Sequence, residues 1–163
     1  LAGNKNLQRS TSNAQHRTFQ AALNHVTLEL AKMIVRDGEG VHRVVTVRVN
    51  GAKTIQDADA AARAVANSAL VKTSWHGGDP NWGRVLAAIG TTGAIFDPAS
   101  VDVAMNGLQV CRNGGVGDPR ELVDLSARDV TVTIDLTAGP ASATILTTDL
   151  THDYVHENAA YST

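Results

Sequence analysis

The chain of 163 residues has the usual size of one compact domain, and its 43% hydrophobic and 18% charged residues exclude a disordered polar segment. The net charge of −2 gives no electrostatic case for binding to nucleic acid or an anionic membrane, so neither is an expected partner. The single cysteine, Cys111, excludes an internal disulfide and fits a reducing cytoplasm. No apolar run reaches the roughly 18–20 residues that span a bilayer.

Aromatic residues make up 4% of the chain, whereas alanine and valine are abundant. Because these side chains are small, we expect the core to contain little apolar material per residue. We therefore expect another chain to complete the surface of this one. The first ten residues, LAGNKNLQRS, lack the charged and apolar regions of a signal peptide. They look like the interior of a longer sequence, such as one product of a cut precursor.

Two segments near the N-terminus predict a helix followed by a strand. Residues 15–36 have apolar side chains at spacings of three, four and seven, typical of an amphipathic helix: Phe19, Leu23, Val26, Leu30, Met33 and Ile34. Gly38 and Gly40 favour a sharp end to this helix. In residues 41–51 valines alternate with polar residues, which predicts a strand.

The next segment is rich in alanine and predicts one helix over residues 54–73, with Thr54 as its N-cap. A stretch dense in turn-forming residues follows. Asp79 followed by Pro80 is the pattern of an N-cap with proline at the first helical position. We therefore expect a short helix over residues 81–90.

Strand patterns dominate the second half of the chain. Residues 101–111 predict a hairpin, because Asn106-Gly107 is a strong short-range signal for a two-residue turn. Residues 129–136 and 142–150 alternate apolar and polar residues and predict two further strands.

A short last helix is expected at the C-terminus, with Asp149 or Thr151 as its cap. Helices grouped apart from antiparallel strands indicate an α+β fold, in which helices are layered on a mostly antiparallel sheet. We expect residues 1–163 to form a single domain, since no linker, repeat or low-complexity stretch interrupts them.

The histidines give no convincing metal site. His152 and His156 are four residues apart and would share one face of the last helix. Two ligands without a cysteine pair do not complete a closed site. We interpret them as surface or partner-contact residues and expect neither a metal ion nor a cofactor.

Two further features are interpreted as structural. The turn of residues 77–84 could bind phosphate at a helix start, but it lacks the spacing of a P-loop or a dinucleotide-binding loop. A tight turn held by Asp79 is the favoured alternative. Cys111 is expected to be an inert buried residue, so the chain offers no convincing nucleophile and no catalytic residue of its own.

Two segments carry groups that suit an amino-acid substrate. Glu39 lies between two glycines just past a helix end, where its carboxylate could hold an ammonium group; a solvated turn acid is the alternative. The tail carries the amide of Asn158 and the free carboxylate of Thr163, and here a plain packed terminal helix is the alternative.

Three segments together resemble the ornithine acetyltransferase family, the bifunctional glutamate N-acetyltransferases of cyclic arginine biosynthesis. They are KMIVRDGEG at 32–40, the string K-T-x-x-x-G-x-D-P-N-W-G-R from Lys72 to Arg84, and the ending D-L-T-x-D-Y-V-x-x-N-x-x-Y from Asp149 to Tyr161. The likeness extends along the whole chain in the right order. It implies the C-terminal part of the family's β chain, within an N-terminal-nucleophile-like αββα architecture.

The resemblance implies a precursor that cuts itself before a threonine and so gives α and β chains. Acetyl then passes from N-acetylornithine to that threonine and on to glutamate, in ping-pong fashion. The nucleophile and the oxyanion hole lie outside this sequence, and Thr11 and Thr18 do not replace the missing threonine. The resemblance assigns substrate binding to Glu39, Asn158 and Thr163.

The partners implied are the α chain and the rest of the β chain of the same precursor, in an α2β2 or larger assembly, with N-acetylornithine and glutamate as small-molecule substrates. Two other functions stay open. One is a non-catalytic assembly or regulatory module. The other is an N-terminal-nucleophile aminopeptidase of the same superfamily, since a fold alone does not determine the chemistry.

Overall fold

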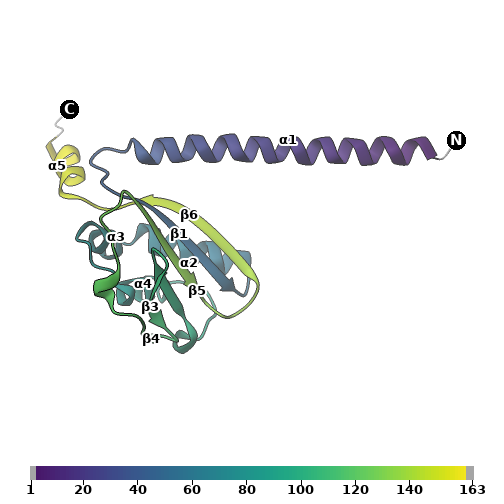
Figure 1. Ribbon diagram of the computed structural model, residues 1–163. Coiled ribbons are helices and arrows are strands. Elements are labelled where there is room, and N and C mark those ends of the chain that lie inside the picture. Colours follow the sequence, from purple (N-terminus) through teal and green to yellow (C-terminus); the bar gives the residue numbers. More distant parts are fainter. Residues whose placement is uncertain (1–2, 161–163) are drawn as a thin grey trace. The chain divides into compact units, whose positions relative to one another are not determined.

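The computed structural model describes residues 3–160, with the side chains of residues 13–160, and divides into two compact units, residues 1–36 and 37–163. The first unit is helix α1 (Gly3–Arg36), which begins before the predicted residue 15 and ends where expected (Figure 1). The six apolar side chains of its predicted pattern are exposed, between 44% and 74%. Among the described residues, no helix is both long and apolar enough to cross a membrane. A single domain over residues 1–163 stays a prediction.

The second unit combines a sheet with four helices in the described residues. Its strands are β1 (Val44–Ala52), β2 (Asp102–Met105), β3 (Leu108–Arg112), β4 (Gly115–Val116), β5 (Asp129–Asp135) and β6 (Ala141–Thr148). Its helices are α2 (Ile55–Asn67), α3 (Ala69–His76), α4 (Trp82–Ile89) and α5 (His152–Ala160). Two single turns of 3-10 helix lie at Pro98–Ser100 and Arg120–Leu122.

The described strands form one six-stranded sheet in the order β4-β3-β2-β5-β1-β6. β1 lies between β5, to which it is parallel, and β6, to which it is antiparallel, so that Val47 pairs with both Val132 and Ile145. The other neighbouring strands are antiparallel. The predicted α+β class and the mostly antiparallel sheet are confirmed.

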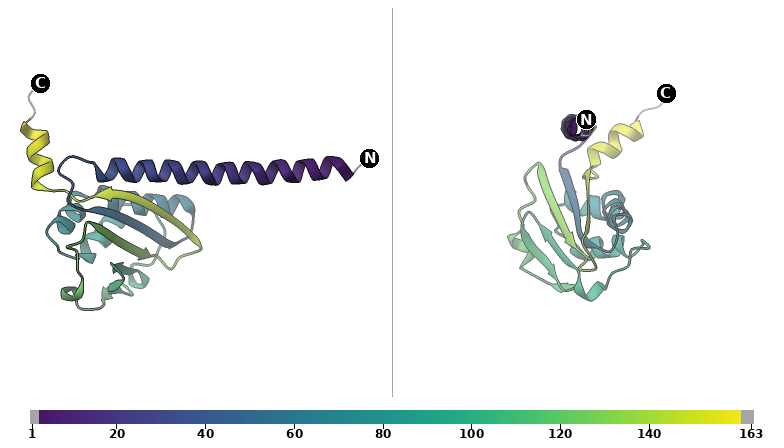
Figure 2. Two further views of the ribbon diagram at one scale, coloured as in Figure 1. Left: turned by 45° about the horizontal axis from the view of Figure 1, so that its top comes forward. Right: turned by 90° about the vertical axis from the view of Figure 1, so that its right-hand side faces the viewer.

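One face of this sheet carries the core. Val45, Val47 and Val49 alternate with more polar residues along β1 and are 0% exposed, as the sequence pattern predicted. α2 packs on β1 and β6, and α3 and α4 lie beside it; the turned view on the right of Figure 2 shows the helices on one side of the sheet. The face of α2 that meets the strands is made of small side chains, which let the helix approach closely: Ala58, Ala61, Ala62, Val65 and Ala66.

The predicted single helix over residues 54–73 is wrong, because Ser68 interrupts it. Thr54 caps α2 as predicted, its hydroxyl accepting a hydrogen bond from the N–H of Asp57 at 3.1 Å. At Ser68 the backbone is extended, and the serine hydroxyl accepts a hydrogen bond from the N–H of Val71 at 3.4 Å. Ser68 thus ends α2 and caps α3.

The predicted N-cap Asp79 is also wrong. α4 begins at Trp82, and its cap is Asn81, whose Oδ1 accepts a hydrogen bond from the N–H of Arg84 at 3.1 Å. Asp79 instead accepts a hydrogen bond from the amide of Asn81 at 2.9 Å and so holds the capping residue in place. Pro80 therefore precedes the cap and does not occupy the first helical position.

The predicted hairpin at Asn106-Gly107 is confirmed. β2 and β3 pair around it, and φ is 48° at Asn106 and 88° at Gly107, both in the left-handed region that a type I′ turn requires. The short strand β4 then pairs with β3.

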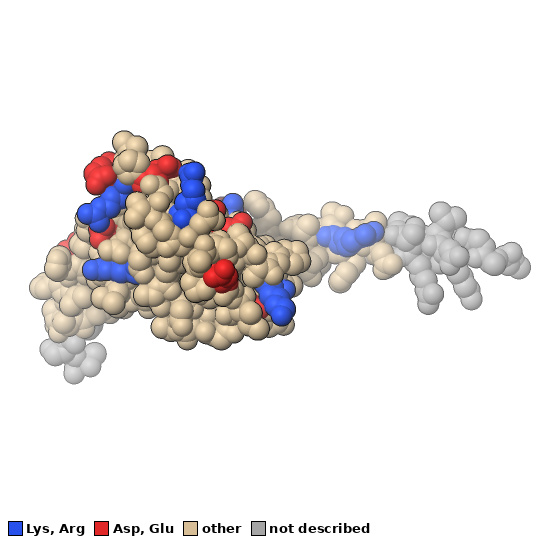
Figure 3. Space-filling view, turned by 90° about the horizontal axis from the view of Figure 1, so that it is seen from below, with Lys and Arg blue, Asp and Glu red and all other residues tan. Residues whose placement is uncertain are grey.

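Acidic and basic side chains are interspersed over the body of the second unit in the view of Figure 3. This mixture agrees with the net charge of −2. Among the described residues drawn on that face, the basic side chains do not gather into a positive patch of the kind that would attract a polyanion.

Candidate functional site

Residues 37–43, the segment that leads into β1, pack against the first turn of α5. Gly40 has a φ of +63°, in the left-handed region that favours glycine. A Cβ at this position would overlap the backbone of Asp153 and Tyr154. The glycine that follows Glu39 therefore allows this segment to lie directly on the backbone of α5.

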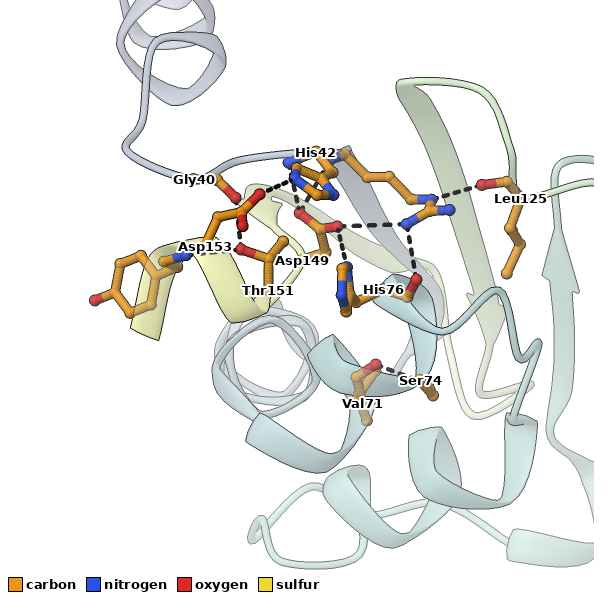
Figure 4. Close-up of polar contacts among 11 residues, drawn as sticks. Gly40, His42, Val71, Ser74, His76, Leu125, Asp149, Thr151 and Asp153 are labelled. Carbon is orange, nitrogen blue, oxygen red and sulfur yellow. Dashed lines mark hydrogen bonds and ion pairs between the residues drawn. The ribbon is translucent and has the colours of Figure 1, made fainter. Parts of the chain in front are cut away.

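Thr151 fastens this contact. Its hydroxyl donates a hydrogen bond to the carbonyl of Gly40 at 2.6 Å and accepts one from the N–H of Tyr154 at 2.9 Å (Figure 4). The second bond satisfies an amide of the first helical turn, so Thr151 is the N-cap of α5. Of the two caps that the sequence left open, the structure selects this one.

Asp149 anchors the same segment from a buried position. Its side chain is 0% exposed, and its Oδ1 accepts hydrogen bonds from the N–H groups of His42 and Arg43 at 3.2 and 2.9 Å. The Arg43 guanidinium lies 3.5 Å from Oδ2 and donates shorter bonds to the carbonyls of Leu125 at 2.6 Å and His76 at 3.0 Å. The buried carboxylate thus joins the end of β6 to the segment that precedes β1.

Two histidines lie beside Asp149, and a third lies beside one of them. Nδ1 of His76 is buried without a hydrogen-bond partner among the described residues and lies 3.6 Å from Oδ2 of Asp149. Nε2 of His42 lies 2.6 Å from Oδ2 of Asp153, and the ring of His76 is 5.3 Å from that of His42 and 5.6 Å from that of His152. Because donor atoms of His42, His76 and Asp149 all lie within 4.8 Å of one another, these three residues could hold a metal ion.

Arg84, at the end of the turn of residues 77–84, has a structural role. Arg84 donates a hydrogen bond from α4 to the carbonyl of Leu70 on α3 at 2.7 Å, which agrees with the interpretation of this turn as structural. Burial lowers the pKa of the Lys72 amine, and the negative charge of Asp149 acts in the opposite direction. A hollow of about 400 Å³ lies between the end of α3 and the start of α5, and His76, Thr151 and His152 are among the residues that line it.

The structure brings Glu39 and Asn158 onto segments that touch. Glu39 is exposed and directly precedes Gly40, the residue that lies on the first turn of α5. Asn158 is exposed on α5 itself, where its amide donates a hydrogen bond to the carbonyl of Tyr154 at 2.8 Å. Thr163, the third residue assigned to substrate binding, lies outside the described residues.

The cluster around Asp149 was not found by sequence reasoning. His42, His76 and Asp149 come from a loop, a helix end and a strand end, and no local spacing connects them. Cys111, in contrast, is buried as predicted, and burial raises the pKa of its thiol, with the charge of Asp102 adding to this effect.

The model of the ArgJ family matches residues 1–163. The arginine biosynthesis bifunctional protein ArgJ of Thermobifida fusca is 54% identical over 145 residues, which are 89% of this chain and 38% of that protein. The protein of the same name from Streptomyces coelicolor is 50% identical over 148 residues, or 91% of this chain and 39% of its own length. The chain thus spans about two fifths of the length of these curated relatives.

The crystal structure of the arginine biosynthesis bifunctional protein ArgJ from Bacillus halodurans matches with a TM-score of 0.83 and 33% identity, over 89% of this chain and 70% of that one. This likeness confirms the predicted N-terminal-nucleophile-like α+β architecture. Because the family model covers the whole chain and the solved structure shares its fold, the chain belongs to the ArgJ family.

Proposed function

We propose that this chain is part of an acetyltransferase that moves acetyl from N-acetylornithine to glutamate. The proposal is supported by its family, whose relatives are named as bifunctional proteins of arginine biosynthesis. A threonine outside these residues attacks the acetyl carbonyl, the C–N bond breaks and ornithine leaves with its amine protonated. The amine of glutamate then attacks the acetyl-threonine ester and releases the hydroxyl. This makes the chain an incomplete glutamate N-acetyltransferase, with no catalytic residue of its own.

The observation that carries the proposal is the contact between the segment of Glu39 and the first turn of α5. This contact puts the residue that follows Glu39 against the helix that bears the amide of Asn158. A carboxylate suits the ammonium groups of ornithine, and an amide can bind either an ammonium or a carboxylate. We assign substrate binding to these two residues and to the terminal Thr163.

The remaining parts of the enzyme come from other chain segments. The α chain and the rest of the β chain, produced by self-cleavage, supply the threonine and the oxyanion hole. We propose an α2β2 or larger assembly in the cytoplasm, without a cofactor, a nucleic acid or a membrane as partner.

The test is Glu39→Ala in the complete protein. Loss of a charged contact costs on the order of 1.5–3 kcal/mol, so kcat/KM for N-acetylornithine should fall roughly 10- to 150-fold. Because Glu39 is exposed, Tm should not change. Asp37→Ala is the matched control, since it removes an exposed acid two residues away. Unchanged kinetics for Glu39→Ala, or an equal loss for the control, would end the assignment.

A second experiment concerns the tail and the alternatives. Deleting Ser162 and Thr163 should reduce activity more than stability, whereas equal loss of both would make the tail a structural element only.

Acetylation of glutamate that depends on N-acetylornithine separates the proposed enzyme from an aminopeptidase, which would hydrolyse peptides instead. A folded complete protein with neither activity would be the non-catalytic module.

A further inference from the structure

A metal-binding arrangement lies around the buried carboxylate of Asp149. Asp149 follows β6, His76 ends α3 and His42 lies in the segment before β1, so one ion here would contact three separate elements (Figure 4). The donor atoms lie within 4.8 Å of one another. We propose that His42, His76 and Asp149 form a binding site for a divalent transition metal ion, with zinc as the best fit.

The distance between two of the donors supports this proposal. Nδ1 of His76 and Oδ2 of Asp149 are 3.6 Å apart, which is too long for a hydrogen bond. Two ligands of one tetrahedral zinc ion lie roughly 3.4 Å apart, because each metal–ligand bond is about 2.0–2.2 Å long. Nδ1 of His76 is buried and finds no hydrogen-bond partner among the described residues, so its lone pair is available to a metal.

The surrounding bonds orient the other ligands. Oδ1 of Asp149 accepts hydrogen bonds from the N–H groups of His42 and Arg43, which fixes the carboxylate and directs Oδ2 toward His76. The ring of His42 contacts Asp153 through Nε2 at 2.6 Å. A carboxylate on one ring nitrogen is the usual support of a metal-bound histidine, and it leaves the lone pair on Nδ1.

The charges nearby determine which ion fits. Arg43 lies 3.5 Å from Oδ2 of Asp149, and Lys72 also interacts with that carboxylate. Two positive groups disfavour ions that bind chiefly through charge, such as Mg²⁺ and Ca²⁺, whereas imidazole ligands favour zinc. Three protein ligands leave a fourth position of a tetrahedral ion for water. We expect weaker affinity than in a closed four-ligand site.

The test is a calorimetric titration of the complete, chelator-treated protein with Zn²⁺. One saturable site is expected, and Mg²⁺ should not compete for it. His42→Ala and His76→Ala should each weaken Zn²⁺ binding roughly ten- to hundredfold or more. His156→Ala is the matched control, because His156 is exposed on α5 and lies outside the cluster.

Two further measurements keep the outcome clear if a variant folds poorly. Co²⁺ added to the unchanged protein should give the visible absorption of a tetrahedral site with nitrogen ligands. Zn²⁺ should raise Tm of the unchanged protein and of His156→Ala but not of His76→Ala. Absence of saturable Zn²⁺ binding, or equal binding by all three histidine variants, would overturn the proposal and leave an ordinary ion pair between His76 and Asp149. These readouts do not depend on acetyltransferase activity.

Discussion

Replacing Thr151 by valine should release α5 from the segment that carries Glu39. The Thr151 side chain makes two hydrogen bonds, to the carbonyl of Gly40 at 2.6 Å and from the N–H of Tyr154 at 2.9 Å. Valine has nearly the same shape and makes neither bond. Within its described residues, His152–Ala160, α5 buries no side chain, so its attachment depends strongly on these contacts at its start.

The magnitude follows from the two bonds. Loss of an N-cap costs about 1 kcal/mol, and loss of the bond to the Gly40 carbonyl costs about 1 kcal/mol more. A decrease of roughly 2 kcal/mol in the free energy of local opening corresponds to about a 30-fold increase in the open population. Global stability should change less, because the core of β1 and α2 does not include α5.

Hydrogen exchange of peptides from α5, followed by mass spectrometry, measures this opening. Thr151→Ser keeps the hydroxyl and should exchange like the unchanged protein. Thr147→Val removes another threonine hydroxyl, which donates to the carbonyl of Ala66 at 3.0 Å, and should leave α5 unaffected. If α5 exchanges equally fast in the valine and serine variants at Thr151, its attachment does not depend on this side chain and the reasoning fails.

Three other predictions use matched pairs or chemical access. Gly40→Ala should lower the free energy of unfolding by clearly more than Gly78→Ala. An alanine at either position must adopt a left-handed φ, which costs about 1–2 kcal/mol, but only at Gly40 would its Cβ also meet backbone atoms of α5. Equal decreases in Tm for the two variants would contradict this. Arg43→Met should destabilise the protein by about 3 kcal/mol in urea titrations, because two carbonyls lose their charged donor, whereas Arg63→Met on the surface of α2 should not. Burial raises the pKa of the Cys111 thiol, so the buried neutral thiol stabilises the folded state below the pKa that the thiol has in the unfolded chain, and this stabilisation is lost as the pH rises through the pKa of the folded state. Alkylation of Cys111 at pH about 8 should therefore need unfolding, and rapid alkylation of the native protein would refute this.

Local rules predicted most of the elements but not their arrangement. The alternation of valines identified β1, and Asn106-Gly107 identified the hairpin, because both signals depend on neighbouring residues alone. The order of the strands depends on long-range pairing, and nothing local indicates that β1 lies between β5 and β6. The break at Ser68 was missed for a related reason. The alanine-rich pattern continues through it, and a single serine side chain ends one helix and begins the next.

The candidate site could also be predicted only in part from the sequence. Glu39 and Asn158 were assigned from motifs that resemble a family, yet residue chemistry alone left Glu39 open as a solvated turn acid. The structure adds one observation beside Glu39, because Gly40 combines a left-handed φ with a close approach of α5. A glycine that only ends a helix can have open space around it, as Gly78 does, whereas a Cβ at Gly40 would meet the backbone of α5. The tight approach shows that Gly40 also allows the segment of Glu39 to pack on α5. Variants at Gly40 should then alter substrate binding through the position of Glu39, although Gly40 itself need not touch the substrate.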